Sequence, residues 1–498
     1  TSSDIIEVNA PTTPMSVPGV TGPTADAQRT VAVLLFENRG QDEDLYLAES
    51  ISEDLIDVLS MVRGLRVRSR GATKVVCKGT CSARDIGRKL NVSTIVEGSV
   101  ARRNDKLFIR ARVISVDNGF VVWAGRKECE PGDFFNATED LGRQIAAALT
   151  EDGITAERPL MAPAANVTDL YLRARHAMRS QWHQGMDDAL GLFEQAIALS
   201  PQDPIILADA AVALARHSFL DENGNHVARA RELAKKALSL APNRAEPYYA
   251  LAQADFIDDK PGDAVIMLRR ALQITEAHAE AHDLLGRILL ELGPLELGLF
   301  HLRRALALDP GQINTRFDLA RGCAFKGLWD QANALMDFPA ATPFTLLLAR
   351  FFKTRMGLWV GQPHTPDEPL PEPDERNQHL LTGIEAFNTL QTTGKINMVY
   401  MMHVYGALGT IGDGRRKAVI LQFLAEMLAY SGEEDGFYQT LSQAQDAGLV
   451  DLMWLDHCPV FEPYRQQERF VTFRGALADH VAQILPKEVL CDPVVASA

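Results

Sequence analysis

A ladder of small and apolar residues, repeated through the middle of the chain, limits the possible folds more than any other feature. Its four copies are Phe193-Ala196-Leu199, Ala234-Ala237-Leu240, Leu268-Ala271-Ile274 and Leu302-Ala305-Leu308. The last three copies are spaced by 34 residues, whereas the first interval is 41 residues and predicts an insertion at 218–227. A recurrence of this length predicts pairs of helices that bury their apolar sides against the next pair. We therefore expect an all-α solenoid, an architecture that offers a concave surface for binding.

The fourth copy carries the residues that identify the repeat type. Small and apolar residues stand where two helices must approach closely and where larger side chains fill the space beside them. These positions are Leu285, Gly286, Leu289, Gly298, Leu302, Ala305 and Pro310. In length and pattern the unit resembles the tetratricopeptide repeat (TPR). The resemblance implies TPR helical repeats over 167–360 and, after a Pro-rich acidic loop at 361–376, C-terminal TPR-like helices and a cap over 377–486, followed by a tail at 487–498.

A different pattern precedes the repeats. A short apolar run at 30–36 and a Gly-Leu-Arg-Val run at 64–69 are typical of buried strands. Three further strand candidates at 93–102, 106–116 and 120–128 are separated by turn residues. Helical patterns cover 47–62, 83–91, with Ser82 as the N-cap, and 133–149. The sequence thus predicts a small α/β domain over 29–150, and an α+β chain overall.

This domain resembles the N-terminal domain of the TolB-like family found in bacterial regulators. The resemblance depends on VAVLLFENRG from Val31, GLRVRSR from Gly64, IGRKLNVSTIVEGSV from Ile86 and DNGFVVWAGR from Asp117. It covers about residues 30–150 and implies no catalytic residue. Flexible linkers are expected at 1–28 and 151–166, because both segments are rich in Pro, Thr or Ala and lack an apolar period.

Charge and composition restrict the class of partner. The 498 residues carry a net charge of −15, which argues against direct binding of nucleic acid by this chain. No run approaches 18 apolar residues, so no transmembrane segment is expected. The sparse cysteines favour a reducing compartment, so a cytoplasmic location is the simplest reading. The six cysteines are too few for a disulfide framework, and whether Cys77 and Cys81 are redox-active is left open.

The motifs of enzymes and metal sites are missing from the sequence. It contains no phosphate-binding loop, nucleophile elbow, kinase loop set or zinc-protease helix. His278 and His282 are spaced so that both can lie on one face of a helix, but packing at the repeat junction explains them better than a metal. We therefore expect no catalytic residues, no metal and no cofactor, and a chain that is not an enzyme.

The first helix of each TPR pair lines the concave groove of the array, so the register predicts which side chains meet a partner. The predicted partner-binding groove consists of Tyr249, Gln253, Phe256, Asp283, Arg287, Leu290, Phe317 and Arg321. Its mixture of aromatic, amide and charged groups suits a protein or peptide partner. We expect charge reversal at Arg287 and Arg321 to weaken partner capture without lowering thermal stability.

The two resemblances together predict a non-enzymatic regulatory or scaffold protein that acts in signal transduction. In proteins that this chain resembles, the same pair of domains follows an output module. That module is a winged-helix DNA-binding domain, a class III adenylate cyclase or a Ser/Thr kinase. We rank the sensory part of a transcriptional regulator first. The alternative is the regulatory half of a signalling enzyme, and a scaffold for cell-envelope or motility components is a third reading. The partner and the oligomeric state are not predicted.

Overall fold

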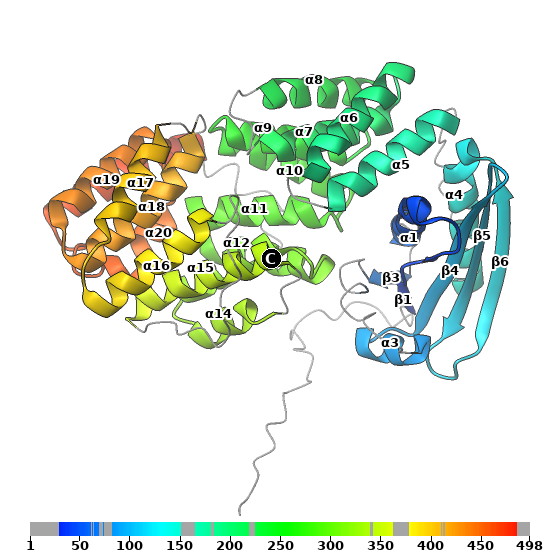
Figure 1. Cartoon of the computed structure of the whole chain (residues 1–498), viewed down its shortest axis with the longest axis horizontal. Helices are drawn as coiled ribbons and strands as arrows, with labels where there is room; N and C mark the ends of the chain where they lie inside the picture. Colours follow the sequence, from blue (N-terminus) through cyan, green and yellow to red (C-terminus); the bar gives the residue numbers. More distant parts are fainter. Residues whose placement is uncertain are drawn as a thin grey trace, which may run out of the picture.

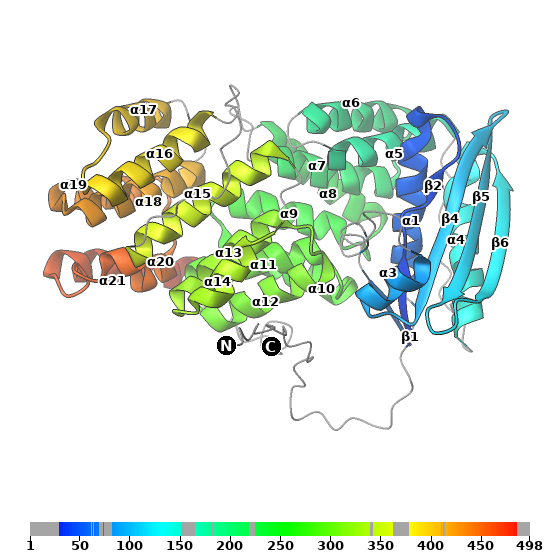
Figure 2. The same cartoon turned by 60° about the horizontal axis from the view of Figure 1, so that its bottom comes forward.

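A computed structural model describes the fold of residues 29–60, 62, 64–68, 73, 82–150, 165–180, 184–218, 225–338, 342–361, 378–409, 411 and 414–485. The predicted linker at 1–28, nearly all of that at 151–166, Cys77 and Cys81 lie outside these residues, as do the Pro-rich loop after Gly361 and the tail at 487–498. A sheet-containing domain forms one end of the molecule and a group of C-terminal helices the other, with paired helices between them (Figures 1 and 2).

The N-terminal domain is built on one mixed sheet in the order β3-β1-β4-β5-β6, with β2 paired to β4. The strands are β1 (Arg29–Val33), β2 (Glu37–Asn38), β3 (Leu65–Arg68), β4 (Thr94–Arg103), β5 (Lys106–Ser115) and β6 (Val121–Cys129). β1 runs parallel to β3 and β4, whereas β4, β5 and β6 form an antiparallel meander. The turn at Asn104 and Asp105 has φ of 48° and 58°, the left-handed values that a tight hairpin requires. The strands predicted from the sequence are confirmed.

Helices cover both faces of this sheet. α1 (Leu45–Ser60) and α4 (Phe134–Leu149) pack on the face that carries the buried Val96 and Val113, while α3 (Ala83–Leu90) covers part of the other face. Ser82 caps α3 as predicted, because its hydroxyl oxygen accepts a hydrogen bond from the Asp85 amide at 3.2 Å.

Among the described residues, five helix pairs follow in the middle of the chain. They are α5 (Ala165–Ser180) and α6 (Gln184–Leu199), α7 (Pro204–His217) and α8 (Asn225–Leu240), α9 (Glu246–Ile257) and α10 (Pro261–Ile274), α11 (Ala279–Leu292) and α12 (Leu295–Leu308), and α13 (Ile313–Phe325) and α14 (Trp329–Met336). The two helices of each pair pack along one another, and neighbouring pairs share one apolar core. The small residues of the fourth pair are needed, since a Cβ added at Gly286 would lie 2.9 Å from the Leu302 nitrogen.

The C-terminal helices form the opposite end of the molecule. They are α15 (Pro343–Val360), α16 (Gln378–Thr393), α17 (Met398–Leu408), α18 (Gly414–Ser431), α19 (Glu434–Asp446), α20 (Leu452–His457) and α21 (Glu468–Ile484). One wholly buried carboxylate, that of Glu426, joins three of them. It accepts hydrogen bonds from Arg355 and Trp359 of α15 and from Trp454 of α20, at 2.6–2.9 Å. A buried charge is tolerated only where its partners are this complete.

Ion pairs join the sheet domain to the first helix pair. Arg175 of α5 lies 2.9 Å from a carboxylate oxygen of Asp54 and 3.4 Å from one of Glu53, both in α1. Arg102 of β4 pairs with Asp169 of α5 at 2.7 Å. The apolar core is continuous across this junction. Within the described part of the chain, we find no helix with both the length and the apolar character that crossing a membrane requires.

Candidate interaction surface

The structure brings the eight predicted groove residues together on α9, α11 and α13, the first helices of the third to fifth pairs. Most of them are not open to solvent. Tyr249, Phe256, Leu290, Phe317 and Arg321 are buried, with Leu290 completely so and Phe317 only 3% exposed. The other three, Gln253, Asp283 and Arg287, are partly exposed. The predicted face therefore exists, but the open groove expected along its whole length does not.

The chain's own C-terminal part covers one end of this face. α20 packs on α11 and α13, and the Arg321 guanidinium donates to Asp451, the N-cap of α20, at 2.9 Å. Arg415 of α18 lies over the ring of Phe256, 3.7 Å from its centroid, and pairs with Glu291 of α11. A repeat array that ended in free solvent would leave these apolar residues exposed, so the C-terminal helices complete its core.

The polar side chains of the face form a chain of ion pairs. Arg287 lies 2.9 Å from Asp283 of its own helix and 3.4 Å from Asp318 of α13. Asp318 in turn lies 3.7 Å from Arg321. Charge reversal at Arg287 or Arg321 would place a carboxylate beside Asp318. Either reversal is therefore expected to destabilise the fold, in contrast to the unchanged thermal stability expected from the sequence.

Burial shapes the proton affinity of these groups. Desolvation raises the pKa of Asp451 to about 6, with Glu291 adding to the effect and the Arg321 guanidinium opposing it. Desolvation also raises the pKa of Asp318, against the attraction of Arg321 and Arg287. Tyr249 has its pKa raised to about 12 by burial, so its hydroxyl stays neutral near pH 7. For Asp318 and Asp451, desolvation thus outweighs the attraction of the neighbouring guanidinium groups.

A strip of the same face remains accessible between the sheet domain and the C-terminal helices. On α7 and α11, the side chains of Arg216 and Glu280 pair at 2.9 Å and are 28% and 41% exposed. Arg287 is 32% exposed, and Gln253 donates to the Tyr249 hydroxyl at 2.9 Å beside them. This accessible strip, defined as Arg216, Gln253, Glu280, Asp283 and Arg287, offers both charges and an amide to a polar partner.

The two histidines considered for a metal point to different partners. His278 is the N-cap of α11, and its Nδ1 accepts from the Ala281 amide at 3.2 Å. His282 contacts the Glu276 carbonyl through Nε2 at 3.0 Å and His301 through Nδ1 at 2.8 Å. Within the described ranges, no group of three or more His, Cys, Asp or Glu side chains is placed to hold a metal ion.

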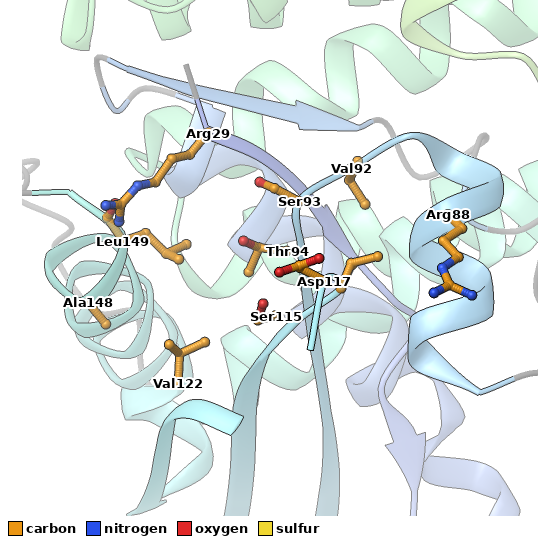
Figure 3. A pocket seen from close by; sticks show the side chains of 11 residues that line it. Arg29, Arg88, Val92, Ser93, Thr94, Ser115, Asp117, Val122, Ala148 and Leu149 are labelled. Carbon is orange, nitrogen blue, oxygen red and sulfur yellow. The ribbon is translucent and has the colours of Figure 1, made fainter. Parts of the chain in front are cut away.

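A cavity of about 610 Å³ opens at one edge of the sheet, between α3 and α4 (Figure 3). Hydroxyl groups of Thr94 and Ser115 and the carboxylate of Asp117 lie toward its centre (Figure 3). Arg29, at its rim, donates to the Leu149 carbonyl and so caps α4. Ser93 is engaged with the backbone of Thr30 at 2.9 Å. Arg29 and Ser93 thus have structural roles, and the arrangement resembles no catalytic constellation.

The residues that sequence reasoning missed are those that close the face from the C-terminal side. Asp451 lies 130 residues from Arg321, and Arg415 lies 124 residues from Glu291. An acidic N-cap before a short helix is visible at Asp451, but nothing local to it indicates which basic residue it meets.

Comparisons with known proteins give one relative and partial structural likenesses. No protein-family model matches the chain. A 243-residue stretch is 28% identical to "Putative adenylate cyclase 3" of Rhizobium meliloti (strain 1021), covering 47% of this chain and 41% of that protein. The chain thus matches about two fifths of that relative's length. Two crystal structures of MamA superpose with TM-scores of 0.24 and 0.25, at 22% and 20% identity. They cover 30% and 34% of this chain, and 84% and 87% of the MamA chains.

Proposed function

We propose that the chain is a non-enzymatic regulatory or scaffold protein that binds a protein or peptide partner through the inner face of a TPR-like array. The observation that carries the proposal is the accessible strip on α7, α9 and α11. It lies on the first helices of consecutive pairs, and it presents both charges beside a buried aromatic floor. An extended segment with alternating charges could form hydrogen bonds along it. The TolB-like α/β domain would hold one end of the array in place.

In this proposal the chain is the sensory part of a larger signalling system, with a transcriptional output ranked first. A second candidate is the regulatory half of a signalling enzyme. The observation that favours it is the 28% identity to a protein named as an adenylate cyclase. Most of that relative's length lies outside the match, so its activity is not transferred to this chain. Under both candidates the purified chain forms no cyclic AMP from ATP, and turnover would contradict the non-enzymatic reading.

The strip can be tested by exchanging the charges of one ion pair. Arg216→Glu places two carboxylates together, whereas the double variant Arg216→Glu/Glu280→Arg restores a pair of opposite charges. The single variant is expected to lose both stability and partner. The double variant is expected to recover most of the stability. It should still bind the partner at least about tenfold more weakly, because each partner charge would then meet a like charge at positions 216 and 280.

The measurement is co-purification of the partner with the tagged chain, alongside thermal unfolding of each variant. Arg270→Glu, on the outer helix α10, serves as a control for a general change of surface charge. If the double variant keeps both its stability and its partner, the Arg216–Glu280 pair serves the fold alone and the partner binds elsewhere.

A further inference from the structure

The sheet of the N-terminal domain ends in a long strand with an open edge. In the described part of the chain, β6 pairs only with β5, and both views show it at the outer limit of the molecule (Figures 1 and 2). Its nine residues contain no proline, and the one irregularity, at Val113/Ile114 of β5, lies near its beginning. A long and regular edge strand presents unpaired backbone groups to which another strand can add.

The outer face of the neighbouring strands is basic. Leu107, Ile109 and Val113 of β5 point into the core, so the alternating residues Arg110 and Arg112 point outward. α3 covers this face only near Ile95 and Ile114, at the ends of β4 and β5 that line the cavity. Elsewhere on this face, no helix of the described part of the chain covers the strands, and Arg110, Arg112 and Arg126 are exposed.

Three arginines of this open face have no carboxylate partner. Its carboxylates are already engaged: Glu97 with Arg112, Glu128 with Lys106 and Glu37 with Arg39. For Arg103, Arg110 and Arg126, the described residues supply no ion pair. Arg110 stands directly opposite Arg126 across β5 and β6, an arrangement of like charges that destabilises a sheet. A structural role does not account for such a pair.

The charges also distinguish between possible strand partners. If two copies of β6 paired antiparallel about Arg126, the two Arg126 side chains would face each other, with the Arg110 side chain of each copy behind them. Such pairing is opposed by four like charges. An incoming strand with acidic side chains on the same face would instead neutralise Arg126 and Arg110. Phe120, just before β6, and Val121, its first residue, are 74% and 51% exposed, and they could cover apolar residues of that strand.

We propose that the open edge of β6 is a docking site for an extended acidic peptide segment of a partner protein, which adds as a further strand beside Arg126. Main-chain hydrogen bonds would supply affinity, and the Arg110–Arg126 pair would select acidic side chains at alternate positions. This site lies on the sheet domain, separate from the helical face of the proposed function, so either one can fail without the other.

The test uses a fluorescein-labelled nonapeptide of alternating Glu and Val, with fluorescence anisotropy as the readout. We expect it to bind the full chain, and a Lys/Val peptide of equal length to bind at least about tenfold less well. Arg110→Glu/Arg126→Glu should weaken binding of the Glu/Val peptide by a similar factor. Arg66→Glu/Arg68→Glu, on the opposite edge strand β3, is the matched control and should leave binding unchanged.

Hydrogen exchange separates strand addition from simple charge attraction. The Glu/Val peptide should slow amide exchange in Val121–Cys129, and a fully N-methylated peptide of the same charge should neither bind comparably nor slow exchange. Equal binding of the N-methylated peptide would overturn strand addition. Tighter binding of a single-stranded oligothymidylate than of the peptide would overturn the choice of partner, and so would binding that survives the double charge reversal.

Discussion

His282 and His301 meet where α11 and α12 pack together, and their contacts fix the positions of their protons. His282 Nε2 faces the Glu276 carbonyl oxygen, which can only accept, so this nitrogen carries a hydrogen and donates. A neutral His282 therefore accepts at Nδ1, and His301 must donate from its own Nδ1. The Nε2 of His301 is left as a buried acceptor without a hydrogen-bond partner. Protonation of His282 would remove the acceptor of this hydrogen bond, and protonation of His301 would bury an N–H group without a partner.

This pair predicts a loss of stability in mild acid. Burial lowers the pKa of His282 to about 4 and, with His282 beside it, that of His301 to about 3. The unfolded chain has histidine pKa values near 6.5, so unfolding takes up protons below that pH. The stability that depends on neutral histidines should therefore be fully present well above pH 6.5. The free energy of unfolding should fall by about 2 kcal/mol per histidine between pH 7.5 and 5.

Urea unfolding at several pH values checks this prediction. The double variant His282→Leu/His301→Leu should lose most of the dependence between pH 7.5 and 5, whereas His403→Gln, on the exposed side of α17, should keep it. An unchanged pH dependence in the double variant would mean that other groups cause it.

At the scale of the helix, small residues decide how closely two helices pack. A Cβ added at Gly286 would lie 2.8 Å from the Leu302 side chain, and one at Gly298 would lie 2.8 Å from the Leu290 nitrogen. In α6, by contrast, a Cβ at Gly191 would meet nothing within 4 Å. All three are glycines within helices, and they differ only in whether a neighbouring helix lies close to the Cα atom.

We predict opposite effects of one substitution at these two positions. Gly286→Ala should lower the free energy of unfolding by about 1–3 kcal/mol, because α11 and α12 must move apart. Gly191→Ala should raise it by about 0.4–1 kcal/mol, because alanine is the better helix former and restricts the unfolded chain. The urea midpoints of the two variants provide the measurement. A Gly286→Ala variant as stable as the parent would show that the crossing is less tight than described.

The sequence was informative where local pattern decides structure. Periodicity located the strands, the capped helix at Ser82 and the helices around Gly286 and Gly298, because each depends on neighbouring residues. It failed where exposure depends on distant packing. The methionines of α17 illustrate this, because Met401 is buried whereas Met398 and Met402 are 67% and 73% exposed. Their spacing along the helix does not indicate which of them a distant element covers.

For the whole molecule, the inner face of the array is bounded at both ends. Arg175 ties α5 to the sheet domain, and Asp451 with Arg415 ties α11 and α13 to the C-terminal helices. Repeat register could predict which helices line the face. It could not predict that segments more than 100 residues away would pair with Arg321 and Glu291, because repeat register carries no information on how the array ends.

The most direct test of the account is site-specific photocrosslinking in cells that produce the chain. A benzophenone amino acid at Gln253, within the accessible strip, is predicted to give a discrete crosslinked polypeptide. The same group at Ile266, 46% exposed on α10, is predicted to give none. Crosslinking of the partner from Ile266 but not from Gln253, with both variants folded, would contradict recognition by the inner face.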